Sequence, residues 1–398
     1  MRPRLAPALF VFALISAAPA SRGDEPFYQS LAIFPAEKKH NHASCVIELA
    51  NGDLLTAWYR GSGERSADDV EILGAWLRKG EVLWGPRFKL ADTPGYPDCN
   101  PAVFAAPDKT VWLFWPTILD HHWEGALLKF ATAKDDGNHF GPIPWTREGV
   151  LHVTPRDFPA QVEKAIAAIP QADRQRYAAI LKEFTDRSKS ELYQRLGWMP
   201  RVHPTVLKSG RWLLPLYCDT YSISIVLISD DSGATWQTSG PRIGFGNIQP
   251  SLVARNDGSI VAFMRENGPR RRIRLSESKD SGQTWGPVTD STLPNPGAGV
   301  EAIRLANGHW ALVYNDTERG RHSLALSVSD DEGATWRWTR HVERQGTGLG
   351  SFHYPSILQT RDGLIHVTYT HSGSPAGSTI QHAKFNEDWV KLGDGPGR

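Results

Sequence analysis

Short apolar runs alternate with polar and turn-forming residues along most of the chain, and one order of run, turn and run returns six times. A polar residue opens the first run, Gly or an Asn/Asp-Gly pair marks the turn, and the second run is rich in aromatic and β-branched residues. This pattern predicts a β-hairpin in each copy. The copies are HASCVIELANGDLLTAWY from His42, NPAVFAAPDKTVWLFW from Asn100, HPTVLKSGRWLLPLY from His203, QPSLVARNDGSIVAFMR from Gln249, VEAIRLANGHWALVYN from Val300 and YPSILQTRDGLIHVTYT from Tyr354.

A second motif, S-x-D-x-G-x-T-W, follows three of the hairpins, at residues 229–236, 278–285 and 329–336, and a degraded copy reads AKDDGNHF from Ala133. In such a box the Asp side chain can accept backbone N–H bonds across a tight turn, and Gly supplies a positive φ. The aromatic ring can pack between neighbouring sheets. We therefore expect the boxes to be structural.

Aromatic anchors recur about every fifty residues, apart from one interval of about ninety-six. A period of this size with four strands per unit predicts an all-β protein, a six-bladed β-propeller. The anchors are Trp84, Phe140, Trp236, Trp285, Trp336 and Trp389.

The long interval contains an insertion between blades 2 and 3, at about residues 156–196. Its segments QVEKAIAAI and ADRQRYAAILKEFTDRSKSELYQRL have helical spacing of apolar residues and few strand formers, which predicts two or three helices. We expect them to leave from the face that carries the candidate site. There they either form a lid or wall for a substrate or only pack on the rim.

The N-terminus resembles a secretory signal peptide over residues 1–23. Arg2 and Arg4 are followed by an apolar stretch from about Leu5 to Ala17 and by Ala18-Pro19-Ala20. That stretch is too short for an ordinary membrane span, so we expect no transmembrane segment and a secreted or periplasmic protein. Residues 24–398 are interpreted as one propeller domain.

Composition narrows the partners and cofactors. A net charge of +1 gives no bulk electrostatic reason for binding nucleic acid or a membrane surface. The three cysteines, Cys45, Cys99 and Cys218, lack paired C-x-x-C spacing, so we expect buried free thiols, with a Cys45–Cys99 bridge as the alternative. No nucleotide, flavin or metal motif is visible, and chemistry without a cofactor or metal is expected.

In a propeller the inner strands of all blades start at one face. The residues that open the six inner strands are therefore expected to converge on one mouth of the central channel, where a purely packed ring would favour small apolar residues. The alternative is that they satisfy one another around a water-filled channel. These residues, all polar, are His42, Asn100, His203, Gln249, Glu301 and Tyr354.

The ends of the second strands and the loops after them reach the same rim and are rich in charge. Arginine can hold a carboxylate bidentately, so an anionic group on the substrate is expected. Arg265 is the strongest candidate, because it ends a buried strand close to the axis. The rim residues are Arg60, Glu64, Asp68, Asp69, Trp115, Asp120, His121, His122, Asp219, Arg265, Arg270, Arg271, Arg272, Asn315, Arg319, Arg321 and His371.

With these boxes and repeats the mature chain resembles the sialidase (neuraminidase) superfamily of BNR-repeat, or aspartate-box, proteins. The boxes are specific for the fold rather than for catalysis. The resemblance implies that Tyr354 is a nucleophile and that Asp69, with Asp68 as the alternative, is the acid/base. It also implies that Arg265 and Arg321, or Arg319 in place of Arg321, hold a substrate carboxylate.

Two family features are missing. Asn41-His42-Ala43 stands where the family has Arg-Ile-Pro, which removes one clamp arginine. Asn247 or Gln249 stands where the glutamate that assists the tyrosine is expected, and neither amide is a base; Glu301 or His203 can take that role. A phenol needs a neighbouring base to be a good nucleophile at neutral pH, so the site is expected to be sialidase-like but altered.

Histidine is expected to substitute for the lost family residues, since it can act as an acid or a base near neutral pH. The leading hypothesis is an exported glycoside hydrolase acting on a terminal acidic sugar of an anionic oligosaccharide or glycoconjugate. The alternatives are a uronate-directed lyase that uses His and Tyr, similar to related propellers, and a non-catalytic glycan-binding propeller. The expected catalytic residues are Asp69, Tyr354, His42, His203 and Glu301, and the expected substrate-binding residues are Arg265, Arg321, Arg60, Asp68, Asn100, Gln249, Asn41 and Arg319.

Overall fold

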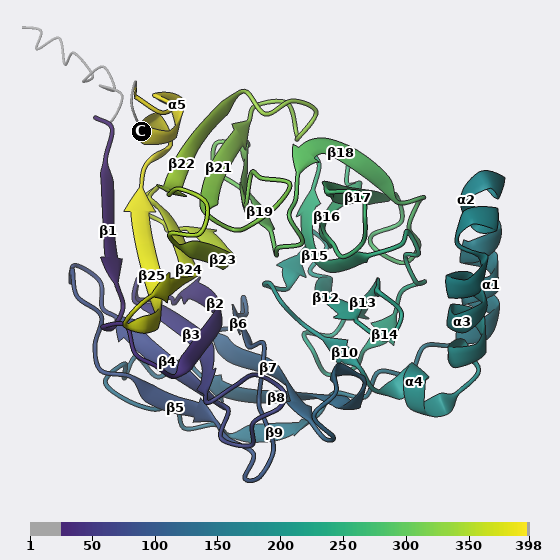
Figure 1. Cartoon of the computed structure of the whole chain (residues 1–398). Coiled ribbons are helices and arrows are strands. Elements are labelled where there is room, and N and C mark those ends of the chain that lie inside the picture. The colour runs from purple at the N-terminus through teal and green to yellow at the C-terminus, as the bar shows by residue number, and fades with distance from the viewer. Residues whose placement is uncertain (1–24, 396–398) are drawn as a thin grey trace, which may run out of the picture.

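Six antiparallel β-sheets stand in a ring about a common axis, as Figure 1 shows in the view along that axis. The computed structural model describes residues 25–395, so the predicted signal peptide lies outside the described residues. Each sheet is one blade, and its strands follow one another from the axis outward. The prediction of a six-bladed β-propeller is confirmed.

The first three blades follow the repeats in chain order, and blade 3 has a divided inner strand because β10 and β11 both pair with β12. Blade 1 contains β2 (His40–Glu48), β3 (Leu54–Gly61), β4 (Glu71–Leu77) and β5 (Phe88–Ala91); blade 2 contains β6 (Ala102–Ala105), β7 (Thr110–Ile118), the 3-10 turn η1 (Trp123–Gly125), β8 (Ala126–Lys134) and β9 (Arg147–Val150); blade 3 contains β10 (Trp198–Met199), β11 (Thr205–Val206), β12 (Trp212–Cys218), β13 (Ile223–Ser229) and β14 (Gln237–Thr238).

The ring is closed by the N-terminal strand, which pairs with β25 as the outermost strand of blade 6. This closure ties the two ends of the propeller together. Blade 4 contains β15 (Asn247–Ala254), β16 (Ile260–Glu266), β17 (Arg272–Ser278) and β18 (Thr289–Pro294); blade 5 contains β19 (Glu301–Arg304), β20 (Trp310–Tyr314), β21 (Ser323–Ser329) and β22 (Trp338–Arg344); blade 6 contains β23 (Ser351–Gln359), β24 (Ile365–Ser374), β25 (Gly377–Phe385) and β1 (Tyr28–Ala32), followed by helix α5 (Glu387–Lys391).

The three intact boxes have the predicted structural geometry. In the first, Asp231 Oδ1 accepts the Thr235 N–H at 2.8 Å and Ser229 Oγ accepts the Gly233 N–H at 2.8 Å. Gly233 has φ +85°, and a Cβ there would lie 2.7 Å from the Trp112 ring of blade 2, so glycine is required both by conformation and by the neighbouring blade.

The degraded box departs from the prediction. Phe140 is 68% exposed, and its ring lies under the Arg78 guanidinium of blade 1, 3.8 Å from the centroid, rather than buried between the blades. His139 is buried instead and stacks on Trp76 of blade 1, with ring centroids 4.4 Å apart. Its Nδ1 lies 2.6 Å from Asp53 and its Nε2 lies 2.9 Å from Asp135, so an imidazole between two carboxylates joins blades 1 and 2 in place of an aromatic ring.

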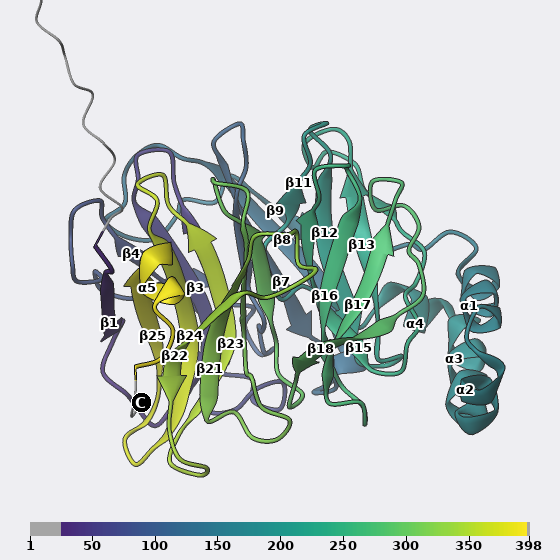
Figure 2. The same ribbon diagram turned by 90° about the horizontal axis from the view of Figure 1, so that it is seen from above.

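The insertion forms four short helices rather than two or three. They pack at the outer edge of the ring beside blade 3, as both views show (Figures 1 and 2), and none of their residues lines the candidate site described below. Among residues 25–395 no helix is long and apolar enough to cross a membrane. The helices are α1 (Phe158–Ala167), α2 (Gln171–Arg176), α3 (Ala178–Ser188) and α4 (Glu191–Arg195).

The cysteine prediction is confirmed. Cys45, Cys99 and Cys218 are all buried and all free, and the alternative bridge between Cys45 and Cys99 is absent.

A buried pair of histidines makes blade 6 sensitive to acid. His366 Nδ1 lies 2.9 Å from His382 Nε2, and Trp84 of blade 1 donates its Nε1–H to His382 Nδ1 at 3.1 Å. This chain of hydrogen bonds therefore needs both rings neutral. Burial, with Lys384 nearby, lowers the pKa of His366 from 6.5 to about 4.

Because the unfolded chain binds this proton near pH 6.5 and the folded chain does not, stability is expected to fall as the pH drops from about 6.5 towards 4. From His366 alone the loss amounts to roughly 3 kcal/mol. Urea unfolding between pH 7 and pH 5 should show it, and His366→Gln should flatten the dependence, whereas exposed His122→Gln should not. An unchanged slope in His366→Gln would contradict the prediction.

Candidate active site

Strained backbone at the start of the inner strands directs side chains to the axis. Ala43, Asn100, Gln249 and Tyr354 have φ values of 56°, 43°, 53° and 53°, a region that side chains other than glycine rarely adopt. In blades 1, 4 and 6 these residues lie in β-bulges, where the pairing register of the inner strand shifts. Bulges re-aim side chains and are common next to functional sites.

The bulges surround a cavity of about 280 Å³, which is called the site cavity below. Its volume is close to the lower end of the range for ligand pockets, about 300 Å³, and suits something the size of one sugar ring. Every blade contributes to its wall, and most of the side chains are polar. The lining residues are His42, Tyr59, Glu64, Asn100, Trp123, Tyr217, Asp219, Gln249, Arg265, Arg321 and Tyr354.

Tyr354 is surrounded by positive charge. Its phenol oxygen accepts hydrogen bonds from Arg265 Nη1 at 2.7 Å and from Gln249 Nε2 at 3.2 Å. The guanidinium carbon atoms of Arg201 and Arg321 lie 4.9 Å and 5.6 Å from the centre of its ring. Negative charge that develops on the phenol oxygen is therefore stabilised from several sides.

Gly299 of blade 5 lies beside this arrangement. A Cβ there would be tight against Gln249 Oε1 at 3.2 Å and in ordinary van der Waals contact with Arg201 Nε at 3.5 Å and Tyr354 Cδ1 at 3.8 Å.

Blade 1 supplies a carboxylate and a neutral imidazole. Glu64 Oε1 accepts the Tyr59 hydroxyl at 2.7 Å and lies 4.0 Å from His42 Nε2. The His42 ring lies beside the ring of Tyr354, with centroids 4.2 Å apart. Burial, together with the positive charge of Arg321 and other cationic neighbours, holds the pKa of His42 well below 6.5, so this imidazole is neutral and able to accept a proton.

The structure brings six of the thirteen residues predicted from the sequence to the site cavity. Arg321 lies in its wall, whereas Arg319 is exposed and takes no part. The six are Tyr354, His42, Arg265, Arg321, Asn100 and Gln249.

The expected acid/base aspartates lie elsewhere. Asp69 accepts bonds from Lys39 Nζ at 2.6 Å and from Ser62 Oγ at 2.6 Å, and these bonds hold its pKa far below the ordinary value. Asp68 is exposed and pairs with His121 at 2.6 Å. Neither side chain lines the cavity, and neither has the position expected of the proton donor.

Two expected substrate-binding residues of blade 1 instead hold the fold together. Arg60 Nε donates to Glu37 Oε1 at 2.7 Å, and the buried Asn41 accepts the Trp58 Nε1–H at 3.0 Å. Neither lines the site cavity.

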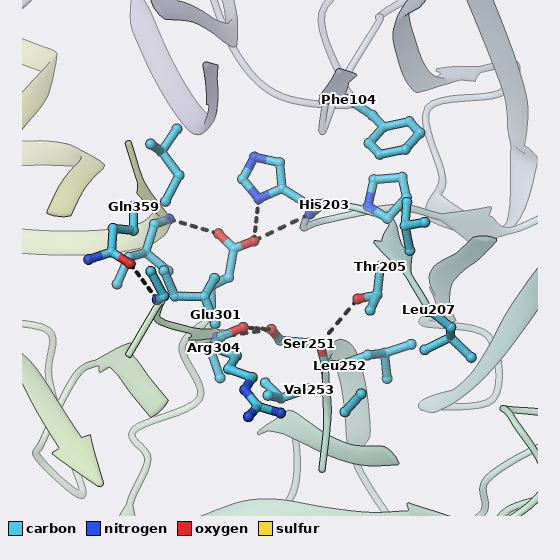
Figure 3. Close-up of a pocket in the computed structure, with 18 of the residues that line it drawn as sticks. Phe104, His203, Thr205, Leu207, Ser251, Leu252, Val253, Glu301, Arg304 and Gln359 are labelled. Atoms are coloured by element: carbon cyan, nitrogen blue, oxygen red, sulfur yellow. Dashed lines mark hydrogen bonds and ion pairs between the residues drawn. The ribbon is translucent and has the colours of Figure 1, made fainter. Parts of the chain in front are cut away.

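His203 and Glu301 were expected at the same mouth, and this is wrong. They lie in a second, wider pocket of about 860 Å³, shown in Figure 3. The site cavity contains His42 and Tyr354 near the beginning of β2 and β23, whereas this wide pocket contains Glu48 and Gln359 at the end of the same strands. The two spaces are therefore at opposite ends of the channel.

The reason is a difference of two residues between the repeats. A backbone hydrogen bond closes each inner hairpin, for example Arg255 N–H to Ser259 O and Leu207 N–H to Arg211 O. In blades 1 to 6, the residue six positions before the donor of this bond is Ala43, Asn100, Arg201, Gln249, Gly299 and Tyr354, respectively. Four positions before it are Cys45, Ala102, His203, Ser251, Glu301 and Ser356. In blades 3 and 5 the polar residue thus lies deeper in the channel than in blades 2, 4 and 6.

His203 and Glu301 form a bridge across the channel. His203 Nδ1 lies 2.6 Å from Glu301 Oε1 (Figure 3). Its Nε2 lies 2.6 Å from the carbonyl oxygen of Val46. Glu301 Oε2 accepts the Ile357 N–H at 2.9 Å. The bridge therefore joins blades 1, 3, 5 and 6.

Both ring nitrogens of His203 face acceptors, which favours the imidazolium. Burial opposes the charge, but Cys45 and Glu301 outweigh it and raise the pKa of His203 well above 6.5. For Glu301 burial is outweighed by His203 and Arg201, which lower its pKa.

Several cavity residues were not proposed from the sequence as site residues. Tyr59, Tyr217 and Arg265 occupy the same repeat position, six residues after the residue whose carbonyl accepts the backbone bond that closes the inner hairpin. The sequence argument for Arg265, that it ends a buried strand close to the axis, therefore applies equally to the two tyrosines. Trp123 comes from the loop before β8 and has no repeat signal. Arg201 has the repeat position of Tyr354, but its side chain is buried behind the tyrosine ring.

Within residues 25–395 no group of three or more His, Cys, Asp or Glu side chains is arranged to hold a metal ion. The groups that line the site cavity include three phenols, two carboxyl groups, one imidazole and two arginines.

Comparison with known families agrees with the fold and the repeats. A family model described as the BNR repeat-like domain matches residues 52–152 and 195–367. The match covers more than half of the chain, which therefore belongs to the BNR repeat-like domain family. The predicted resemblance to sialidases and other BNR-repeat proteins is confirmed.

The similarity to individual proteins is lower. A sialidase of Micromonospora viridifaciens is 27% identical over 177 residues, which are 42% of this chain and only 26% of that relative. A protein of unknown function from Dyadobacter fermentans superposes with a TM-score of 0.68 at 18% identity, over 90% of this chain and 99% of the other.

Two sialidases of known structure have the same fold. The Hadza microbial sialidase Hz136 gives a TM-score of 0.67 at 14% identity, over 91% of this chain and 69% of the other. The NanB sialidase of Streptococcus pneumoniae gives 0.67 at 13%, over 89% and 70%. At such identities the superpositions establish the propeller fold.

Proposed function

We propose that this protein is a glycoside hydrolase of the sialidase type that cleaves a terminal sugar carrying a carboxylate. The observation that carries the proposal is the phenol oxygen of Tyr354, which accepts a hydrogen bond from Arg265 inside a cavity of single-sugar size. Membership of a family that includes sialidases supports it. Export of the chain belongs to the proposal as well, because the sequence begins like a signal peptide.

The cationic wall accounts for the acidic sugar. Arg265 and Arg321 both line the cavity, and neither forms an ion pair within 4.0 Å among the described residues. Arg265 Nη2 is only 3.4 Å from Asn267 Oδ1, and Arg321 Nη2 donates to the Gly297 carbonyl at 2.7 Å. A carboxylate in the cavity would supply the anionic partner that both side chains lack.

The proposed reaction has two steps. In the first, the Tyr354 oxygen forms a bond to the anomeric carbon, the bond from that carbon to the leaving oxygen breaks, and a carboxyl group of the wall protonates that oxygen. The phenol proton passes to neutral His42, which takes the place of the missing glutamate. In the second, water displaces the tyrosine, the carboxylate takes a proton from water, and Tyr354 recovers its proton from His42.

The first test is to incubate the mature protein with oligosaccharides that end in sialic acid or in a uronate and to identify the products by mass spectrometry. Release of the acidic sugar with one water added supports the proposal. An unsaturated uronate, detected by its ultraviolet absorbance, would instead establish elimination. Binding to these glycans without turnover would establish a non-catalytic lectin-like propeller, a reading that the amide of Gln249 at the position of the family's glutamate favours.

A further inference from the structure

Asp219 is a partly exposed residue at the edge of the site cavity, and one of its two carboxyl oxygens is buried without a partner among the described residues. It follows β12 directly and lines the cavity together with Tyr354 and Arg265. Its Oδ1 is inaccessible to water and has no hydrogen-bond partner among the described residues. Nor does any Lys, Arg or His nitrogen of the described chain lie within 4.0 Å of its carboxyl oxygens. Such a group in a cavity is a strong indication of function.

The surroundings of Asp219 favour the protonated acid. Burial is the main cause, and it raises the pKa of Asp219 above its ordinary value of 3.8. The charge of Arg265 opposes the shift, Glu124 and Glu64 add to it, and Arg65 again opposes it. These are the charged groups that face Asp219 from blades 1, 2 and 4. On its own strand the neighbouring titratable groups are the Tyr217 phenol and the Cys218 thiol.

Glu64, the other carboxyl group of the cavity, is in a different environment. Its side chain is 35% exposed, it accepts the Tyr59 hydroxyl at 2.7 Å, and Arg65 Nη1 lies 4.0 Å away. The two carboxyl groups of the wall thus differ in their partners, since Glu64 accepts a hydroxyl and faces a cation whereas Asp219 Oδ1 has neither. Enzymes that need one acid and one base or stabilising charge place two carboxyl groups in such different environments.

We propose that Asp219 of blade 3 is the general acid of this site, in place of an aspartate on the blade 1 loop. The proposal rests on the glycosidase function proposed above and names the proton donor for it. As the Tyr354 oxygen bonds to the anomeric carbon, the leaving oxygen takes the Asp219 proton. In the second step the Asp219 carboxylate takes a proton from the attacking water, which restores the acid.

This role also fixes the side from which the leaving group departs. Trp123 lines the cavity from the loop before β8 and lies in blade 2, next to blade 3. The leaving sugar is therefore directed towards blades 2 and 3, where it meets Trp123, over whose ring the Arg65 guanidinium lies at 5.1 Å from the centroid.

The test compares Asp219→Asn with Glu64→Gln on two substrates that carry the same acidic sugar. In one substrate the leaving group is a hydroxyl oxygen of a second sugar, which must be protonated as it departs. In the other it is p-nitrophenolate, which departs without a proton. For Asp219→Asn we expect kcat/KM to fall about 10²-fold or more on the first substrate and less than about 10-fold on the second. For Glu64→Gln the two substrates should be affected alike.

The pH profile and the infrared spectrum provide independent readouts. With the sugar leaving group, the alkaline limb of kcat/KM should belong to Asp219 and disappear in Asp219→Asn. In a pH series, the difference spectrum of parent minus Asp219→Asn should retain the carbonyl stretch of a protonated carboxyl group to a pH above 3.8. Equal melting temperatures would show that the asparagine variant is folded.

Four results would overturn the assignment. Equal losses on both substrates in Asp219→Asn, or a loss selective for the sugar leaving group in Glu64→Gln, would refute it while leaving the glycosidase function intact. A protonated-carboxyl band that is already lost at pH 3.8 would refute it whatever the activity. A parent protein that cleaves neither substrate would refute the proposed function and this role together.

Discussion

Tyr354→Phe should reduce kcat by on the order of 10³-fold or more, with little change in the fold. The substitution removes the oxygen that is to form the covalent bond but keeps the ring that packs 4.9 Å from the Arg201 guanidinium and beside His42. The cost in stability is about 1 kcal/mol, because the two donors from Arg265 and Gln249 lose their acceptor. Steady-state kinetics and thermal unfolding measure the two effects.

A matched control is Tyr314→Phe. This tyrosine is also buried, its hydroxyl lies 3.2 Å from Ser327 Oγ, and it belongs to blade 5 outside the site cavity. It should lose a similar hydrogen bond and keep its activity. If Tyr354→Phe retained more than about a tenth of kcat, the phenol oxygen would not be the nucleophile, and a mechanism carried by the carboxyl groups would replace it.

Glu301→Gln is expected to destabilise the protein by roughly 3–5 kcal/mol, because it leaves the His203 imidazolium buried without its counter-charge. Glu301 is 2% exposed and bonds to His203 and to the Ile357 N–H, so its removal weakens the link between blades 3, 5 and 6. Urea unfolding at pH 7 gives the free energy. Lys208→Gln, on the exposed rim of the same wide pocket, should change it by less than about 0.5 kcal/mol.

The same bridge predicts the sign of a pH effect. The pKa of His203 is raised by folding, so its contribution to stability is complete below pH 6.5 and is lost as the pH rises through the pKa of the folded protein. The parent should therefore lose stability at alkaline pH, and Glu301→Gln should lose less. If the Glu301→Gln variant were as stable as the parent, the charge of the His203–Glu301 pair would contribute nothing to stability that an amide hydrogen bond does not.

Most of the fold could be predicted from local sequence patterns. The six hairpins and the three boxes are visible because strand alternation and turn chemistry are short-range properties. The failures were also local: Phe140 occupies the aromatic position of a box, but the buried contacts of His139 with Asp53 and Asp135 took the interblade position from it. The closing strand β1 was missed because its partner β25 is almost the whole chain away.

In the candidate site, too, residues marked by the repeats were predicted and residues placed by long-range contacts were not. Tyr354, Arg265 and Arg321 were identified because each falls in a repeat or on a loop beside one, and all three line the cavity. Asp69 does not line the cavity, and sequence alone does not show that Lys39 and Ser62 bind its carboxylate. Glu64 and Asp219 were visible only as two of many charged residues on the rim.

By itself, then, the sequence determined a six-bladed propeller with structural boxes, a helical insertion and a channel mouth that is rich in polar groups. Only the tertiary structure decided which of those groups meet. A shift of two residues leaves a strand side chain on the same face but moves it about 7 Å along the strand. That displacement removes His203 and Glu301 from the mouth and pairs them deeper in the channel. Packing between blades, which no single repeat encodes, decides which rim carboxyl group has an oxygen without water or a partner. Asp219 Oδ1 is that oxygen in the site cavity.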